Sequence, residues 1–416
     1  MGDKVPLARR LGTADAVTIG LGSMIGAGVF AAFGPAARAA GAGLLIGLAL
    51  AAVIAYCNAT ASAQLAAVYP TSGGTYIYGR ERLGPWWGFI AGWGFVIGKT
   101  ASCAAMALTV ASYTIAGPGW VQRAIAVAAV VALAALNYRG VTKTAMLARI
   151  LLACTLIALA AVAIGIAVTK PGSTHLTTWS GTTVYGVLQS AGLLFFAFAG
   201  YARIATMGEE VRDPARTIPR AITIALAIAV AIYLVVAVAV LLAAGPDRLA
   251  SAAAPLAEAL RATGAARLVP VVAIGGAVAS MGALLALIAG VGRTALAMAR
   301  NRDLPGWLAA VHPRYQVPHH AEVALAAVVC VLAATVDLRG VIGFSSFGVL
   351  IYYAIANAAA YTLPGRGWLR VVTVCGLAGC LVLVATLPWQ SVVIGLGVFA
   401  VGIAGRAFVV RSSSVR

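Results

Sequence analysis

GSMIGAGVF, residues 22–30, places three glycines inside the first apolar run of the chain, which extends from about residue 14 to 37. A run of this length can cross a bilayer. Glycine weakens a helix and leaves backbone N–H and C=O groups free, and at membrane depth these groups need protein or a water-filled cavity around them. The stretch therefore indicates either a broken helix with a binding site made of backbone, or close helix packing through Gly22 and Gly26.

The composition excludes a soluble globular protein. Of the 416 residues, 62% are hydrophobic and 10% are charged, a balance that is typical of a polytopic membrane protein. Hydropathy predicts an all-α protein in which a single transmembrane domain, residues 1–416, holds 12 transmembrane helices. The expected spans are 14–37, 42–68, 86–114, 121–138, 148–168, 184–207, 219–244, 268–298, 321–336, 340–362, 369–387 and 389–409.

Membrane topology accounts for the net charge of +18. Most lysines and arginines fall in loops on the same side as the N-terminus, which predicts that both termini are cytoplasmic and that the protein lies in the plasma membrane. The lipid bilayer, and not nucleic acid, is thus the expected partner of the basic residues. The six cysteines lie in apolar runs without paired metal spacing, so the sequence predicts neither a metal site nor a cofactor.

A second broken span is expected at residues 195–214, FFAFAGYARIATMGEEVRDP, where Gly200 lies in mid-span. It comes five spans after the first, and glycine-interrupted spans in corresponding positions indicate an inverted repeat. The first repeat is predicted at residues 14–168 and the second at residues 184–362. Residues 369–409 would then form two additional C-terminal helices.

Three motifs resemble those of the amino acid–polyamine–organocation (APC) superfamily. GSMIGAGVF resembles the helix 1 motif G-x-x-I-G-x-G-[IV]-F, and FFAFAGY with EEVRDPARTIPRAI resembles the helix 6 motif F-x-F-x-G-[FY] followed by E-E-x-x-[ND]-P. ALAMARNRDLPGWLAAVHPRYQVPH is similar to the loop after helix 8. The motifs follow the family's order and cover most of residues 14–362. The resemblance implies an amino acid permease of the LeuT-type fold, a 5+5 inverted repeat with broken helices 1 and 6.

The resemblance also implies a substrate site. Backbone N–H groups at residues 26–28 would hold the substrate carboxylate, in agreement with the preference of half-helix N-termini for anions. Carbonyls at residue 24 or 25 and at 196–199 would hold the ammonium, and Phe198 is either an occluding gate or a packed aromatic residue. The predicted substrate-binding residues are Met24, Ile25, Gly26, Ala27, Gly28, Lys99, Phe196, Phe198, Ala199, Gly200 and Arg203.

Two cations lie within predicted spans. Lys99 follows Trp87 by about 18 Å of helix in a core about 30 Å thick, which places it near the midplane, and no acid is expected at similar depth. Lys99 should therefore lose its proton or bind an anion, and by resemblance it faces the pocket. Arg203 follows Ala202, which replaces the family's usual acid; it either faces the pocket or snorkels toward Glu209 and Glu210.

Ion coupling has two possible sources. By resemblance, sodium would lie between the carbonyls of Gly22 and Ile25 and the hydroxyl of Ser280. That site would have few ligands, because only one hydroxyl falls in this part of helix 8. Some relatives carry a helix 5 lysine instead, whereas this chain has only Cys154 and Thr155 there. Proton coupling through Lys99 is therefore favoured over sodium.

The predicted function is secondary active transport of a neutral or anionic amino acid by alternating access, because an unpaired cation in a dry pocket repels cationic cargo. A transporter of cationic amino acids or polyamines is the alternative within the superfamily. A sensor, or a subunit of a larger complex, is the alternative of another class. An enzyme is not expected, because the four histidines lie in predicted loops and no nucleophile–base pair is visible. The individual amino acid and the oligomeric state stay open.

Overall fold

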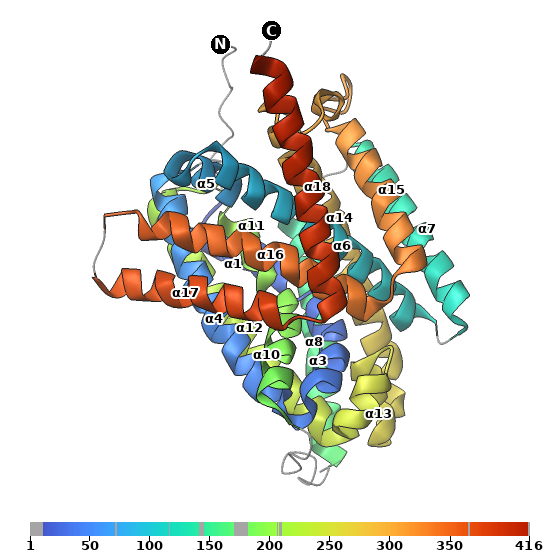
Figure 1. Cartoon of the computed structure of the whole chain (residues 1–416). Coiled ribbons are helices and arrows are strands. Elements are labelled where there is room, and N and C mark those ends of the chain that lie inside the picture. Colours follow the sequence, from blue (N-terminus) through green and yellow to red (C-terminus); the bar gives the residue numbers. More distant parts are fainter. Residues whose placement is uncertain are drawn as a thin grey trace.

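The computed structural model describes residues 11–70, 73–115, 117–140, 145–169, 182–205, 207, 210–364 and 367–414. These residues form helices joined by turns (Figure 1). The only β-type pairing among them is an isolated bridge between Leu11 and Val211. The expectation of an all-α chain is thus confirmed for the described part of the protein.

Helices α1 to α8 precede the segment that lies outside the described residues at 170–181. They are α1 (Thr13–Met24), α2 (Ala27–Ala31), α3 (Phe33–Ala40), α4 (Leu44–Val68), α5 (Thr75–Leu83), α6 (Pro85–Thr114), α7 (Gly119–Tyr138) and α8 (Ala145–Thr169), with the 3-10 turn η1 (Gly41–Gly43).

The remaining helices follow that segment. They are α10 (Val184–Phe198), α11 (Ala202–Ala205), α12 (Pro214–Ser251), α13 (Pro255–Ala262), α14 (Val269–Arg300), α15 (His319–Thr335), α16 (Leu338–Tyr361), α17 (Gly367–Thr386) and α18 (Trp389–Ser414), with the 3-10 turns η2 (Ala199–Tyr201), η3 (Ala266–Leu268) and η4 (Gly306–Ala309).

Within the described ranges, 11 helical segments are long and apolar enough to cross a membrane. Helix α15 falls below that length with 17 residues, about 25 Å. The chain is therefore polytopic, and the count of 12 spans stays a prediction. The short helices α5 and α13 lie at opposite ends of the molecule in Figure 1, and the C-terminal part of α18 reaches the same end as α5. We call these the α5 end and the α13 end.

The first apolar run is interrupted within the glycine-rich stretch. Helix α1 ends at Met24, Ile25 has φ −83° and ψ 59°, and Gly26 has φ −114° and ψ −139° before α2 begins. Ala32, between α2 and α3, keeps helical angles of −72° and −23°, so α2 and α3 continue in nearly one direction. A Cβ atom at Gly22 would meet no atom within 4 Å. The break is thus present, and Gly22 is not a packing contact.

The second interruption lies against the first. Helix α10 gives way to the turn η2 at Ala199, and α11 follows. A Cβ atom on Gly28 would lie 2.5 Å from the Cα atom of Ala197, and one on Gly200 would lie 2.3 Å from the carbonyl oxygen of Ser23. Since real Cβ atoms do not approach backbone so closely, both positions require glycine for the two interrupted helices to touch.

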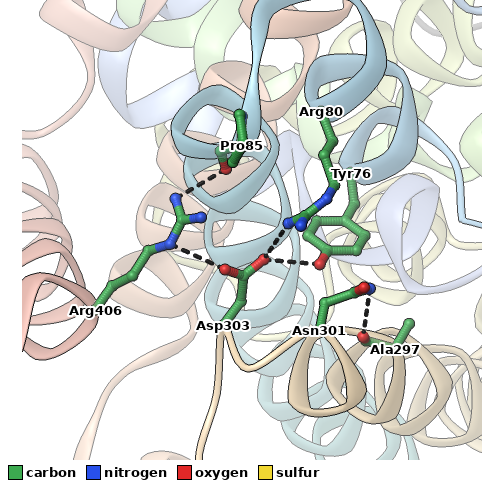
Figure 2. Close-up of polar contacts among 7 residues, drawn as sticks. All are labelled: Tyr76, Arg80, Pro85, Ala297, Asn301, Asp303 and Arg406. Carbon is green, nitrogen blue, oxygen red and sulfur yellow. Dashed lines mark hydrogen bonds and ion pairs between the residues drawn. The ribbon is translucent and has the colours of Figure 1, made fainter. Parts of the chain in front are cut away.

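A buried carboxylate joins three distant segments at the α5 end (Figure 2). Asp303, which follows α14, accepts a hydrogen bond of 2.7 Å from the hydroxyl of Tyr76 and lies 3.2 Å from Nη1 of Arg80, both on α5. Nε of Arg406 on α18 lies 2.9 Å from its other oxygen. Burial and the contact with Asp303 raise the pKa of the Tyr76 hydroxyl, so this group remains a proton donor.

Arg406 is fixed from the other side as well. Its Nη1 donates to the carbonyl of Pro85 at 2.8 Å, and its guanidinium carbon lies 4.4 Å from the ring centre of Trp86 and 4.9 Å from that of Phe89. Cation–π contacts of this kind are attractive. The side chains of Arg406 and Asp303 are 5% and 3% exposed. A desolvated ion pair therefore holds α18 to the segment after α14, while the Pro85 and ring contacts hold it against the start of α6.

We expect Asp303→Asn to destabilise the protein strongly, because it leaves two guanidinium groups without their shared counter-charge. Breaking a buried pair costs about 3–5 kcal/mol. Heating the detergent-solubilised protein and following the monodisperse fraction by size exclusion measures the loss. The control is Arg216→Gln, whose ion pair with Asp213 at 3.8 Å is largely exposed and should contribute little. Equal melting temperatures for the two variants would contradict the assignment.

Candidate functional site

The two interruptions are linked by one tyrosine of α12. The hydroxyl of Tyr233 lies 2.6 Å from the carbonyl oxygen of Met24 and 2.9 Å from that of Ala197. These carbonyls belong to the last residues of α1 and α10, where a helix leaves its C=O groups without intrahelical partners. Phe198 packs on the ring of Tyr233, with ring centres 5.0 Å apart. The structure thus shows Phe198 as a packed aromatic residue, fully buried.

Lys99 reaches the second interruption. Its Nζ atom donates a hydrogen bond of 3.1 Å to the carbonyl oxygen of Ala199, and the residue is 6% exposed. It forms no ion pair with any described acid. Lys99 is therefore buried in the protein, and its position near the membrane midplane stays a prediction. Its partner is not an anion but the free carbonyl of a helix break.

A tyrosine of α16 completes this contact. The hydroxyl of Tyr353 lies 3.3 Å from the same Ala199 carbonyl. Its ring stacks on Tyr201 at 5.0 Å and meets Phe195 edge-on at 5.7 Å. These aromatic residues are fully buried. Three long helices, α6, α12 and α16, therefore each send one hydrogen-bond donor to the interrupted backbone.

The start of α2 offers backbone N–H donors, in contrast to the carbonyl acceptors at the ends of α1 and α10. The N-cap residue Gly26 makes no side-chain cap, and the first N–H groups of a helix have no intrahelical partner. Because Ala32 keeps helical angles, these groups stand at the positive end of a helix that extends to Ala40. Residues 26–28 and 196–200 thus lie together as expected, with carbonyl acceptors on one side of the break and N–H donors on the other.

Arg203, on α11, extends toward Glu210, seven residues later in the sequence. Its Nη2 lies 3.8 Å from Oε1 of Glu210, and the two side chains are 34% and 33% exposed. This geometry agrees with the snorkelling alternative. Glu209, the other acid named for this contact, lies outside the described residues.

The helices named for ion coupling also meet. A Cβ atom on Gly26 would lie 2.9 Å from Cβ of Ala283 and 3.8 Å from the carbonyl oxygen of Ala279, so α14 packs directly on the break. Ser280, between these residues, is fully buried and its hydroxyl has no hydrogen-bond partner among the described residues. Gly22 and Ile25 border the same break. No group of three or more His, Cys, Asp or Glu side chains in the described ranges could hold a metal ion.

Contacts hold the outer ends of both halves of the first interrupted helix. At the start of α1, Leu11 exchanges two backbone hydrogen bonds with residues 210 and 212, of 3.1 and 2.9 Å, and Asp15 pairs with Arg149 on α8. Toward the α13 end, Arg38 on α3 donates to the carbonyl of Ala250 at 2.7 Å. Each half of the first interrupted helix is therefore pinned to the body of the protein near its outer end.

Sequence reasoning missed Tyr233 and Tyr353. Tyr233 is the one hydroxyl-bearing residue among residues 224–244, and Tyr353 directly follows Tyr352 in the largely apolar stretch 347–356. A buried tyrosine usually finds a partner for its O–H group, so these positions carried a signal. That signal does not say which carbonyl is the partner.

The similarity to known proteins extends over nearly the whole chain. Residues 11–400 match the amino acid permease family. A protein of Mycobacterium tuberculosis described as an uncharacterized transporter is 62% identical over 406 residues, covering 96% of this chain and 90% of that protein. A branched-chain amino acid permease of Bacillus subtilis is 25% identical, covering 93% of this chain and 90% of that protein.

A plant relative is similar over the same region. Cationic amino acid transporter 7 of Arabidopsis thaliana is 28% identical over 424 residues, which cover 92% of this chain and 71% of that protein. The relatives are named as transporters, not as enzymes. The family match spans both interrupted helices and every donor that meets them. The chain belongs to the amino acid permease family of the APC superfamily and is a transporter.

Proposed function

We propose that this protein is a secondary active permease that moves a neutral or anionic amino acid across the plasma membrane by alternating access. The observation that carries the proposal is the meeting of two interrupted helices at which acceptors and donors are separated: the carbonyls of Met24, Ala197 and Ala199 on one side and the start of α2 on the other. An amino acid carries an ammonium and a carboxylate on neighbouring atoms, and the two kinds of backbone end match these groups.

The packing of the long helices supports two five-helix repeats, residues 14–168 and 184–362. If α1 corresponds to α10, α4 to α12, α6 to α14, α7 to α15 and α8 to α16, contacts should occur in matched pairs. The matched contacts are α1 with α12 and α10 with α4, α1 with α8 and α10 with α16, α8 with α14 and α16 with α6, α6 with α7 and α14 with α15, and α8 with α12 and α16 with α4.

The proposed orientation follows the basic residues. Arg80, Arg82 and Arg216 all lie at the α5 end or at the helix terminus that faces it, and positive charge is enriched on cytoplasmic faces. We place the α5 end in the cytoplasm, together with both termini. Twelve spans, α17 and α18 included as the two additional helices of residues 369–409, are consistent with that arrangement.

Lys99 and Arg203 bear on the choice of cargo. Lys99 has no described acid as a partner, so a second cation bound beside it would meet repulsion that a dry site does not screen. A neutral or anionic amino acid avoids this repulsion. The relative named as a cationic amino acid transporter keeps cationic cargo as the alternative, and a pocket-facing turn of Arg203 would disfavour it further.

We propose protons as the coupling ion, with Lys99 as the carrier, charged in one facing state and neutral in the other. The carbonyls of Gly22 and Ile25 and the hydroxyl of Ser280 are the candidate sodium ligands. Ser280 is the single side-chain oxygen in this set, so the protein would offer sodium only three oxygen atoms. That shortage favours protons over sodium.

Alternating access requires the pinned ends to release in turn. Opening of the α5 end would break the Asp15–Arg149 pair and the hydrogen bonds between Leu11 and residues 210 and 212. Opening of the α13 end would break the contact of Arg38 with Ala250. These contacts are few and local, which suits a gate that must open on every cycle.

We expect proteoliposomes that contain the wild-type protein to accumulate a labelled neutral or acidic amino acid when the outside is acidic. For one proton per substrate, a gradient of about one pH unit, worth about 1.4 kcal/mol, supports up to about tenfold accumulation. Lys99→Ala and Lys99→Met should lose this response to the gradient. Uptake of a cationic amino acid alone, or accumulation that follows a sodium gradient, would contradict the proposal.

We expect Gly200→Ala to abolish transport, because its Cβ atom would lie 2.3 Å from the carbonyl oxygen of Ser23 and would push the two interruptions apart. The matched control is Gly290→Ala on α14, where a Cβ atom would meet nothing within 4 Å. Initial rates of labelled uptake should fall by about tenfold or more for Gly200→Ala, or about 1.4 kcal/mol, with Gly290→Ala close to wild type. Equal rates would show that the close approach is not needed.

A further inference from the structure

The carbonyl of Ala199 has both of its acceptor positions taken by side chains. Nζ of Lys99 donates to it at 3.1 Å and the hydroxyl of Tyr353 lies 3.3 Å away. A carbonyl oxygen carries two lone pairs, so two such contacts satisfy it. Lys99 comes from α6 and bridges to η2, which is 100 residues distant in sequence. The lysine thus holds the position at which an amine from any other source would bind.

An incoming ammonium group cannot share that position. Its N–H groups would need the acceptor that Lys99 Nζ uses, and two ammonium groups at hydrogen-bond distance from one oxygen repel each other, since buried charges are poorly screened. Lys99 must therefore leave the Ala199 carbonyl when a substrate amine takes it. The substrate's own carboxylate offers the displaced lysine a new partner of opposite charge.

The hydrogen bond from Lys99 to Ala199 also stabilises the carrier without substrate. When the site closes with nothing bound and Lys99 is absent, the buried Ala199 carbonyl would keep only the 3.3 Å contact with the Tyr353 hydroxyl. A second acceptor position left unfilled is costly at membrane depth. The side chain of Lys99 removes that cost because it donates a hydrogen bond of its own. A lysine amine donates N–H groups whether it is protonated or neutral, so the contact is compatible with proton coupling.

We propose that Lys99 is a tethered substitute for the amine of the substrate. It caps the Ala199 carbonyl while the carrier returns across the membrane without cargo, and it yields the carbonyl to the cargo's amine in the loaded carrier. This inference rests on the proposed function and assigns Lys99 a role in the return step, which is separate from carrying a proton. Net transport then depends on Lys99 more strongly than exchange of one bound substrate for another, because only net transport includes the empty return.

The test measures net uptake and exchange in the same proteoliposomes with equal pH on both sides. Net uptake is uptake of labelled amino acid into vesicles without internal substrate, which requires the carrier to return empty. Exchange is uptake of label at saturating concentration into vesicles loaded with the unlabelled amino acid, which never requires an empty return. We expect Lys99→Met to lower net uptake by about tenfold or more and to lower exchange by a smaller factor, so that the ratio of exchange to net uptake rises well above that of wild type.

The matched control is Thr100→Val on the same helix. The Thr100 hydroxyl donates to the carbonyl of Val96 within its own helix, so the variant removes one polar group from α6 without touching the break. Its ratio of exchange to net uptake should equal that of wild type. Retained exchange also shows that Lys99→Met is folded.

Three results would overturn the inference. Lys99→Met could lose exchange and net uptake together, which would make the lysine a general requirement for substrate binding. It could keep both, which would show that the Ala199 carbonyl needs no cap. Thr100→Val could show the same selective loss, which would assign the effect to α6 as a whole. If instead the wild-type protein shows neither activity with any amino acid, the proposed function itself fails.

Discussion

Unpaired backbone groups are the constraint on which this structure depends. A helix that breaks inside a membrane releases carbonyls and N–H groups that lipid cannot satisfy. Here the released carbonyls are met by side chains from three other helices: Tyr233 from α12, Lys99 from α6 and Tyr353 from α16. The interruption is therefore a property of five helices and not of two. These contacts fix the directions of the carbonyl groups, so that their dipoles surround one point.

Close approach of the two interruptions determines how that point is built. Gly28 lies on Ala197 and Gly200 lies on Ser23 with no room for a Cβ atom, so the acceptors of both breaks fall within reach of one tyrosine hydroxyl. Movement of α1 or α10 changes the distance from the Tyr233 hydroxyl to the carbonyl of Met24 or of Ala197. The hydroxyl of Tyr233 thus links the two breaks, and an opening at one end of the protein would change its hydrogen bonds.

The sequence predicted the features that depend on local signals. Glycines inside apolar runs marked both interruptions, whereas the depth of Lys99 in the membrane, taken from the helical rise after Trp87, stays a prediction. Features that depend on tertiary distance could not be predicted. Nothing near Ala199 or Asp303 in the sequence identifies Lys99 or Arg406 as the partner, because the contacts cross 100 and more residues. Gly22 also belonged to the predicted small-residue pair, yet it has open space where a Cβ atom would stand.

The carboxylate of Asp303 gives the last helix a part in assembly. Ribosomes deliver α5, α6 and the Asp303 loop well before Arg406 on α18 emerges, so until then the buried carboxylate has only the partly exposed Arg80 as a cationic partner. Insertion of α18 supplies the second guanidinium and covers Trp86 and Phe89. The charge of Asp303 is therefore fully neutralised only after the last helix has been synthesised and inserted. A chain that stops short of Arg406 lacks the second guanidinium beside Asp303 and the contacts over Trp86 and Phe89, so its α5 end should open locally more often.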